Sequence, residues 1–276
     1  MLIQRLLAAI VLIPLVIICL FFLPLPGFIA VMIAISGLAT WEWSQFLHLH
    51  SRQHKSVFTL IFTLFIIAIY YVSTQQIGVV KVVLLLSLAW WLLALLLVVS
   101  YPNSVRFWRH NVVKTLFACV TLLPFVLGMI ALRQVNYSDN SFQGAFWLLY
   151  VLVLVWATDS GAYFAGRALG KHKLAPRVSP GKTIEGLIGG VIAALLISLL
   201  VYVSGYFFIS FDTLMLSSIC AILVSVLGDL TESMFKREAN IKDSGHLIPG
   251  HGGILDRIDS LTAAIPVFAA LILYVL

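Results

Sequence analysis

Charged residues are scarce in this chain: Asp, Glu, Lys and Arg make up 10% of its 276 residues, whereas 62% of the residues are hydrophobic. A soluble globular domain averages about 25% charged residues. A chain of this composition cannot cover its own surface in water. The sequence therefore excludes a soluble globular protein and predicts one that lipid surrounds along most of its length.

Cysteine is also rare. The three cysteines, Cys19, Cys119 and Cys220, lie inside apolar runs and show no C-x-x-C spacing. This pattern argues against disulfides and a cysteine-ligated zinc site and indicates small hydrophobic side chains. The formal net charge of +6 is typical of basic loops beside anionic lipid in a membrane protein, so we expect no nucleic-acid partner.

Long polar stretches are missing too, and no internal repeat, low-complexity segment or soluble domain is evident. A transmembrane helix needs about 20 mainly apolar residues, and the apolar runs here are too continuous for barrel strands, the other structure that satisfies its backbone in lipid. The first run follows Gln4 and Arg5 without a small-residue cleavage site, so we expect a retained span. The sequence predicts an all-α polytopic membrane protein with about nine transmembrane helices: 6–24, 27–46, 57–74, 79–100, 112–132, 145–165, 185–208, 213–235 and 260–276.

Basic residues are unevenly distributed between the two sets of loops. With the N-terminus on the cytoplasmic side, only Lys81 and Arg133 among the 17 Lys and Arg residues fall on the opposite side. Cytoplasmic loops carry an excess of Lys and Arg. The distribution therefore predicts a cytoplasmic N-terminus, and an odd number of spans places the C-terminus outside.

Acidic residues are nearly absent from the first half of the chain, where residues 1–140 contain only Glu42 and Asp139. We interpret 1–140 as an N-terminal transmembrane scaffold. We interpret 141–276 as the catalytic region of the same integral membrane unit.

The stretch 225–260 carries the densest group of ionisable residues. Asp229, Glu232, Ser233 and Lys236 recur at helical spacing and so share one face of a helix. Asp256 and Asp259, three residues apart, share a face of the last span. Carboxylates can hold Mg²⁺ together with substrate phosphates, and Lys and Arg neutralise phosphate charge. The alternative is a set of salt bridges that fasten helix ends at the membrane interface.

Glycine and histidine lie between these two acidic faces. Gly250, Gly252 and Gly253 allow a backbone to approach an anion closely. For His246 and His251 we favour loop packing or phosphate contact over zinc, because no cysteine is nearby and no H-E-x-x-H pattern occurs.

Two further clusters accompany this stretch. Asp159 is the only acid of the sixth span and is expected to approach the same side, although it could be a polar helix end. The G-K-T triplet within 179–186 is similar to a phosphate loop, but position 176 is Pro and we expect no preceding strand. The segment instead predicts a helix start with Glu185 in its first turn, and a helix N-terminus beside Lys182 suits an anion. The G-x-x-x-G pair Gly186 and Gly190 indicates close helix packing, within the chain or in a dimer.

The run from Ser233 to Asp259 resembles the motif of the phosphatidate cytidylyltransferases, the CDP-diacylglycerol synthases, at every fixed position. The segments around Asp159 and 179–185 also resemble family features, whereas the first 140 residues are similar only in hydropathy. The resemblance implies transfer of CMP from CTP to phosphatidic acid by a homodimer in the inner membrane. The distribution of basic residues places the active site on the cytoplasmic side. The resemblance also implies Mg²⁺, alone or with a second cation.

On this basis we expect Asp229, Asp256 and Asp259 to bind the metal and to act in catalysis with Lys236 and Arg237. Ser233 could bind a metal or a phosphate. The expected substrate-binding residues are Asp159, Ser179, Lys182, Thr183, Glu185, Ser233, Lys242, Asp243, His251, Gly252, Gly253 and Arg257.

Three alternatives stay open at this point. A transporter would also place ionisable residues within spans, but such proteins tend to have related halves and sites at the bilayer midplane. A CDP-alcohol phosphatidyltransferase would need a D-G-x2-A-R pattern that this sequence lacks. Polyprenyl phosphate could replace phosphatidic acid as the acceptor.

Overall fold

The computed structural model describes residues 2–76, 78–245, 247 and 252–276, and helices dominate them. A helix lies at each of the nine expected spans. These helices are α1 (Leu2–Phe21), α2 (Leu25–Trp43), α3 (Arg52–Gln75), α4 (Gly78–Val99), α6 (Asn111–Gln134), α7 (Gln143–Leu169), α8 (Ile184–Val203), α9 (Phe211–Glu238) and α10 (Leu255–Ala270). A short helix, α5 (Val105–Trp108), precedes α6, and a π-helical turn, η1 (Leu271–Val275), extends α10.

Eight helices in the described part of the chain are long and apolar enough to cross a membrane, and α1 adds a shorter apolar segment, Ile10–Phe21. The prediction of an all-α polytopic membrane protein is therefore confirmed. The number nine and the orientation of the termini stay predictions.

One expectation was wrong: a short strand does lie at the G-K-T triplet. The strands β1 (Lys173–Ala175) and β2 (Ser179–Thr183) form an antiparallel hairpin, and α8 begins directly after β2. The hairpin forms in the polar stretch between α7 and α8, where each strand satisfies the other's backbone. Because this two-stranded antiparallel sheet has no βαβ unit, the rejection of a phosphate loop is unaffected.

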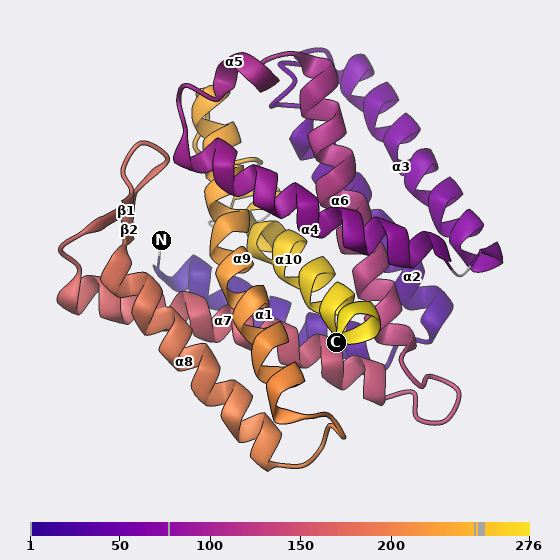
Figure 1. Ribbon diagram of the computed structural model, residues 1–276. Coiled ribbons are helices and arrows are strands. Elements are labelled where there is room, and N and C mark those ends of the chain that lie inside the picture. The colour runs from indigo at the N-terminus through magenta and orange to yellow at the C-terminus, as the bar shows by residue number, and fades with distance from the viewer. Residues whose placement is uncertain (1, 77, 246, 248–251) are drawn as a thin grey trace.

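Helix α10 occupies the centre of the bundle, in contact with α4, α6, α7 and α9 (Figure 1). Its side chains from Thr262 to Ala270 are buried. Helices α3 and α8 lie at the periphery (Figure 1). The buried residues of α3 are Phe62 and Ile66. Helix α8 exposes Ile188, Ile192 and Leu200. Such apolar outer faces suit contact with lipid tails.

Helices α7 and α8 pack backbone to backbone through small residues. A Cβ atom added to Gly190 would lie 2.5 Å from the carbonyl oxygen of Thr158, and one added to Gly161 would lie 2.7 Å from that of Gly189. Small residues allow this approach between helices in lipid. The G-x-x-x-G pair of α8 therefore packs within the chain.

Contacts between helix ends define two ends of the bundle. At one end Trp43 donates to the carbonyl of Lys114 (3.1 Å), and Lys114 forms an ion pair with Glu238 (2.6 Å). At the other, Leu25 donates to the Tyr137 hydroxyl (3.0 Å), and the buried Arg133 binds the carbonyls of Leu23 and Ser141. These contacts match the alternation of loops expected from the sequence. The first end, which also holds the hairpin and the start of α10, is called the basic end below.

Candidate functional site

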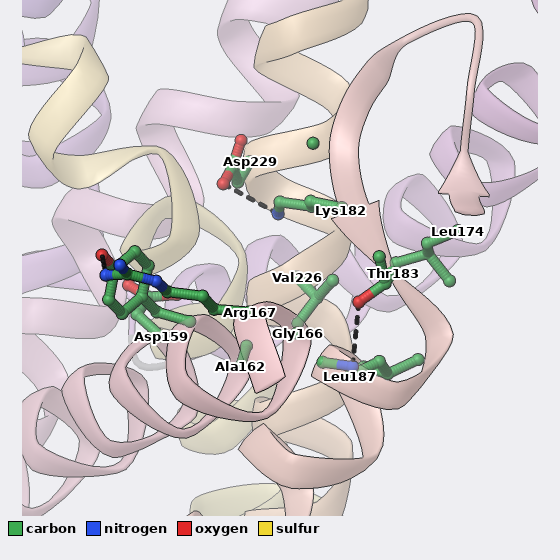
Figure 2. Close-up of a pocket in the computed structure, with 13 residues that line it drawn as sticks. Asp159, Ala162, Gly166, Arg167, Leu174, Lys182, Thr183, Leu187, Val226 and Asp229 are labelled. Atoms are coloured by element: carbon green, nitrogen blue, oxygen red, sulfur yellow. Dashed lines mark hydrogen bonds and ion pairs between the residues drawn. The ribbon is translucent and has the colours of Figure 1, made fainter. Parts of the chain in front are cut away.

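A cavity of about 470 Å³ lies at the basic end between α7, the hairpin, α8 and α9. Its apolar wall includes Leu174, Leu187 and Val226. Figure 2 shows that Asp159 and Arg167 lie on one side and Lys182 and Asp229 on the other. The polar lining consists of Asp159, Tyr163, Arg167, Lys182, Thr183 and Asp229. The cavity thus combines apolar surface with charges of both signs, as an amphiphilic anionic ligand requires.

The local sequence explains how α8 and the hairpin shape this cavity. The Thr183 hydroxyl caps α8 by accepting a hydrogen bond from the N–H of Gly186 (3.1 Å). The Glu185 carboxylate accepts from the backbone N–H groups of Lys171 and His172 and lies 2.6 Å from His172 Nδ1. Glu185 therefore binds the backbone at the base of the hairpin and does not line the cavity. Lys182, in the strand that follows this base, does line the cavity.

The ion pair of Lys182 and Asp229 lines the cavity. Lys182 Nζ lies 2.8 Å from Asp229 Oδ2, and the side chains are 25% and 31% exposed. The Ser233 hydroxyl, one turn further along α9, donates to Asp229 Oδ1 (3.2 Å).

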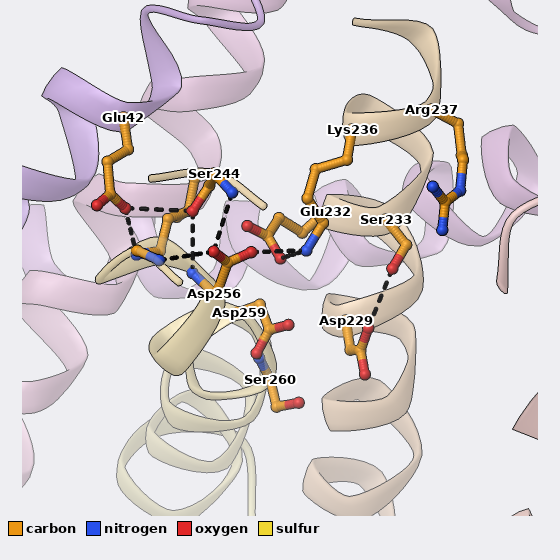
Figure 3. A network of polar contacts seen from close by, with 12 residues as sticks. Glu42, Asp229, Glu232, Ser233, Lys236, Arg237, Ser244, Asp256, Asp259 and Ser260 are labelled. Atoms are coloured by element: carbon orange, nitrogen blue, oxygen red, sulfur yellow. Dashed lines mark hydrogen bonds and ion pairs between the residues drawn. The ribbon is translucent and has the colours of Figure 1, made fainter. Parts of the chain in front are cut away.

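A more deeply buried network lies behind the pair, between α9 and α10. Lys236 Nζ contacts Glu232 (2.7 Å) and Asp256 (2.8 Å), and these two carboxylates are only 4% and 6% exposed. The other oxygen of Asp256 accepts from the backbone N–H groups of Ser244 (2.9 Å) and Gly253 (2.8 Å). Figure 3 shows Asp259 between this network and Asp229. Lys236 therefore binds two internal carboxylates, as the salt-bridge alternative for this cluster had it.

Helix α2 supplies one more acid to this network. Glu42 accepts hydrogen bonds from the N–H groups of Ile254 (2.9 Å) and Leu255 (2.7 Å) and from the Ser244 hydroxyl (3.2 Å). We did not expect Glu42 at the site, because it lies far away in the sequence. The one available signal was its presence as a lone acid in an apolar span.

The glycines of the motif make close contacts with these carboxylates. Gly252 has a positive φ of 82° and lies against Asp256, and a Cβ on Gly253 would lie 2.5 Å from Glu42 Oε1. The sequence predicted close approach of this backbone to an anion. In the structure the anions are the chain's own carboxylates.

The remaining predicted residues lie around this core. The Arg237 Nε donates to the Val178 carbonyl (3.2 Å) and so joins α9 to the hairpin. Lys242, Asp243 and Arg257 are exposed. Ser179 is half-buried at the start of β2. His246, Gly250 and His251 lie outside the described residues. Arg167 and Tyr163 (Nη1 to hydroxyl, 3.2 Å) line the cavity, although neither was predicted as a site residue.

The acidic cluster suits a divalent cation by its chemistry. In the described part of the chain no three His, Cys, Asp or Glu side chains converge as a ready set of metal ligands. Mg²⁺ needs only one or two carboxylates and completes its shell with water and substrate phosphates. Glu232 Oε1 is buried without a hydrogen-bond partner among the described residues, and carboxylates outnumber lysines in the network. A cation beside Asp229 and Asp259 would reduce this excess of negative charge.

The fold is that of a polytopic membrane protein, and its cavity brings cations and carboxylates together at the basic end. The chain belongs to the cytidylyltransferase family, whose model matches residues 3–275. The family match thus extends beyond the C-terminal motif and includes the first 140 residues, where we had recognised similarity only in hydropathy.

Two curated relatives match along nearly their whole length. The phosphatidate cytidylyltransferase of Haemophilus influenzae is 47% identical over 296 residues, covering 100% of both chains. That of Pseudomonas aeruginosa is 42% identical, covering 99% of this chain and 97% of the relative. A third, from Bacillus subtilis, is 40% identical over 53% of this chain and 55% of the relative. These matches confirm the family to which the chain was expected to belong.

Proposed function

We propose that this chain transfers CMP from CTP to phosphatidic acid, forming CDP-diacylglycerol and pyrophosphate. The observation that carries the proposal is the cavity lined by Lys182 and Asp229. It lies at the basic end of the bundle, has an apolar wall, and is lined by two cations, the partly exposed Lys182 and the exposed Arg167. The relatives from Haemophilus influenzae and Pseudomonas aeruginosa are phosphatidate cytidylyltransferases, which supports the same reaction.

The proposed reaction is a displacement at phosphorus. A phosphate oxygen of phosphatidic acid forms a bond to the α-phosphorus of CTP. The bond from that phosphorus to the bridging oxygen breaks, and pyrophosphate leaves with the electron pair. A phosphate monoester is already largely ionised near pH 7, because its second pKa is about 6. The protein therefore needs no strong general base, and its task is to position two anions and to neutralise their charge.

The position of each residue indicates its part in binding the two anions. Lys182 and Arg167 face the cavity and can contact phosphate oxygens directly. Asp229, Asp256 and Asp259 are the residues that would hold Mg²⁺, with Ser233 beside Asp229. When bound, Mg²⁺ supplies charge neutralisation of the triphosphate and of the departing pyrophosphate. Lys236 keeps Asp256 and Glu232 in place from behind.

We also propose that the basic end faces the cytoplasm of a cell whose inner membrane holds the protein. The count of Lys and Arg in the loops supports this orientation. The homodimer implied by the resemblance stays a prediction. Because the G-x-x-x-G pair of α8 packs against α7, a dimer contact would use another surface.

Purified protein in lipid vesicles, given labelled CTP and a panel of acceptors, tests the reaction. We expect labelled CDP-diacylglycerol with phosphatidic acid, one pyrophosphate for each product, and no product with diacylglycerol or phosphatidylcholine. Product formed only with polyprenyl phosphate would show that this lipid, and not phosphatidic acid, is the acceptor. Solute uptake without any CTP-dependent product would favour a transporter.

Replacing His251 by Gln tests the absence of a general base. General acid–base catalysis contributes about 10²- to 10⁴-fold. We expect kcat to fall by less than about a hundredfold in this variant, with an unchanged slope of rate against pH between 6.5 and 8. A larger loss, accompanied by a changed pH profile, would show that His251 takes a proton in the reaction.

A further inference from the structure

The Glu42 carboxylate occupies the N-terminus of α10. That helix starts at Leu255, and its own N-cap residue, Ile254, offers no side-chain hydrogen bond. Glu42 Oε1 accepts from the Ile254 N–H (2.9 Å) and Oε2 from the Leu255 N–H (2.7 Å). An acid at this place satisfies orphan N–H groups and interacts favourably with the helix dipole. The cap therefore comes from another helix more than 200 positions earlier.

The same carboxylate fixes the residue that holds Asp256. The Ser244 hydroxyl donates to Glu42 Oε2 (3.2 Å) and accepts from the Asp256 N–H (3.3 Å), so both of its roles are taken. The Ser244 N–H donates to the Asp256 carboxylate (2.9 Å). Gln45, one turn beyond Glu42, donates to the Ser244 carbonyl. A continuous chain of contacts thus runs from Glu42 through Ser244 to Asp256 and on to Lys236.

The surroundings of Glu42 are shaped around its charge. The side chain is only 4% exposed, and no cation pairs with it among the described residues. An unpaired buried carboxylate is costly unless hydrogen bonds stabilise it. Gly245 and Gly253 flank it so closely that a Cβ on Gly253 would lie 2.5 Å from Oε1. The three groups that hydrogen-bond to Glu42 in the described part of the chain, the Ile254 and Leu255 N–H groups and the Ser244 hydroxyl, all donate to it, as a carboxylate requires.

We propose that Glu42 is a positioning residue for the reaction: it anchors the start of α10 and, through Ser244, sets the position of the Asp256 carboxylate. The inference rests on the proposed function. It also assigns the N–H groups at the start of α10 to Glu42 and not to a substrate phosphate. The cations and the metal ligands at the cavity then make the contacts with the substrate phosphates.

The test compares Glu42→Gln with the intact protein. The amide keeps the size of the side chain but turns an NH₂ group toward N–H donors. Outer partners of metal ligands typically contribute 10- to 100-fold in metal affinity or activity. We expect the Mg²⁺ concentration for half-maximal CMP transfer to rise about tenfold. We also expect faster hydrogen exchange at the Ile254 and Leu255 amides.

A loss of folded protein alone would leave the Mg²⁺ dependence unchanged. Glu238→Gln is the matched control, because it removes a contact away from α10. That contact is the ion pair between Glu238 of α9 and Lys114 of α6. This control should lower thermal stability without shifting the Mg²⁺ requirement.

Ser244→Ala provides a second variant that removes no buried charge. It should raise the Mg²⁺ requirement in the same direction, and its combination with Glu42→Gln should be no worse than the stronger single variant. A Mg²⁺ requirement within twofold of the intact protein in both variants would overturn the inference. If the intact protein itself fails to transfer CMP, the proposed function fails, and the exchange measurement still tests the Glu42 contact.

Discussion

Asp229→Asn is expected to lower kcat for CMP transfer by about a thousandfold or more while the protein remains folded and inserted. Asp229 lies at the boundary between the cavity and the buried network, bound to Lys182 and Ser233. Asparagine keeps the shape but removes the charge that would hold a metal and that orients the lysine. Loss of a single preorganised electrostatic contact typically costs about 10²- to 10³-fold, and here two functions are lost together. Steady-state rates with saturating CTP and phosphatidic acid measure the effect.

Asp212→Asn is the matched control for this variant. Asp212 lies in the first turn of the same helix, α9, at the opposite end of the bundle, and its side chain is exposed. The substitution and the helix are the same, but Asp212 lies far from the cavity and has neither the Lys182 ion pair nor the Ser233 hydrogen bond of Asp229. We expect normal activity. Comparable rates in the two variants would remove Asp229 from the site.

The sequence predicted the helices well because lipid imposes a strong and local constraint. Each spanning segment must be long, apolar and helical, so its position is visible in a short window of residues. The acids of α9 and α10 were visible for the same reason, since a charge such as Asp229 is conspicuous in an apolar run. Their helical spacing then showed which of them share a face.

The rest of the site depends on contacts between segments that are distant in the chain. Nothing near Glu42 indicates that it reaches Leu255, because that contact exists only when α2 and α10 pack together. The hairpin was missed because its strands are short and polar, without the alternation of a half-buried strand. Lys236 was expected to bind phosphate from its charge, and only the structure shows that two buried carboxylates already surround it.

The position of Lys236 predicts the largest effect on stability. Lys236→Met would leave Glu232 and Asp256 together without their shared cation, and both side chains are almost fully buried. Removing one partner of a buried ion pair typically costs about 3–5 kcal/mol. We expect a large fall in the thermal midpoint in detergent and little CMP transfer. Lys173→Met, at the exposed start of β1, should change neither.

The double variant Lys236→Met with Glu232→Gln separates a structural role of Lys236 from a role in binding substrate. It removes one of the two uncompensated charges, so much of the lost stability should return. If Lys236 acts only by holding Asp256 and Glu232 in place, activity should recover in part along with stability. If stability returns and transfer stays absent at saturating CTP, Lys236 also contacts the reacting phosphates. Unchanged thermal stability in Lys236→Met itself would contradict the buried network, because two neighbouring buried carboxylates that lose their cation must stay charged or take up a proton, and both cost free energy.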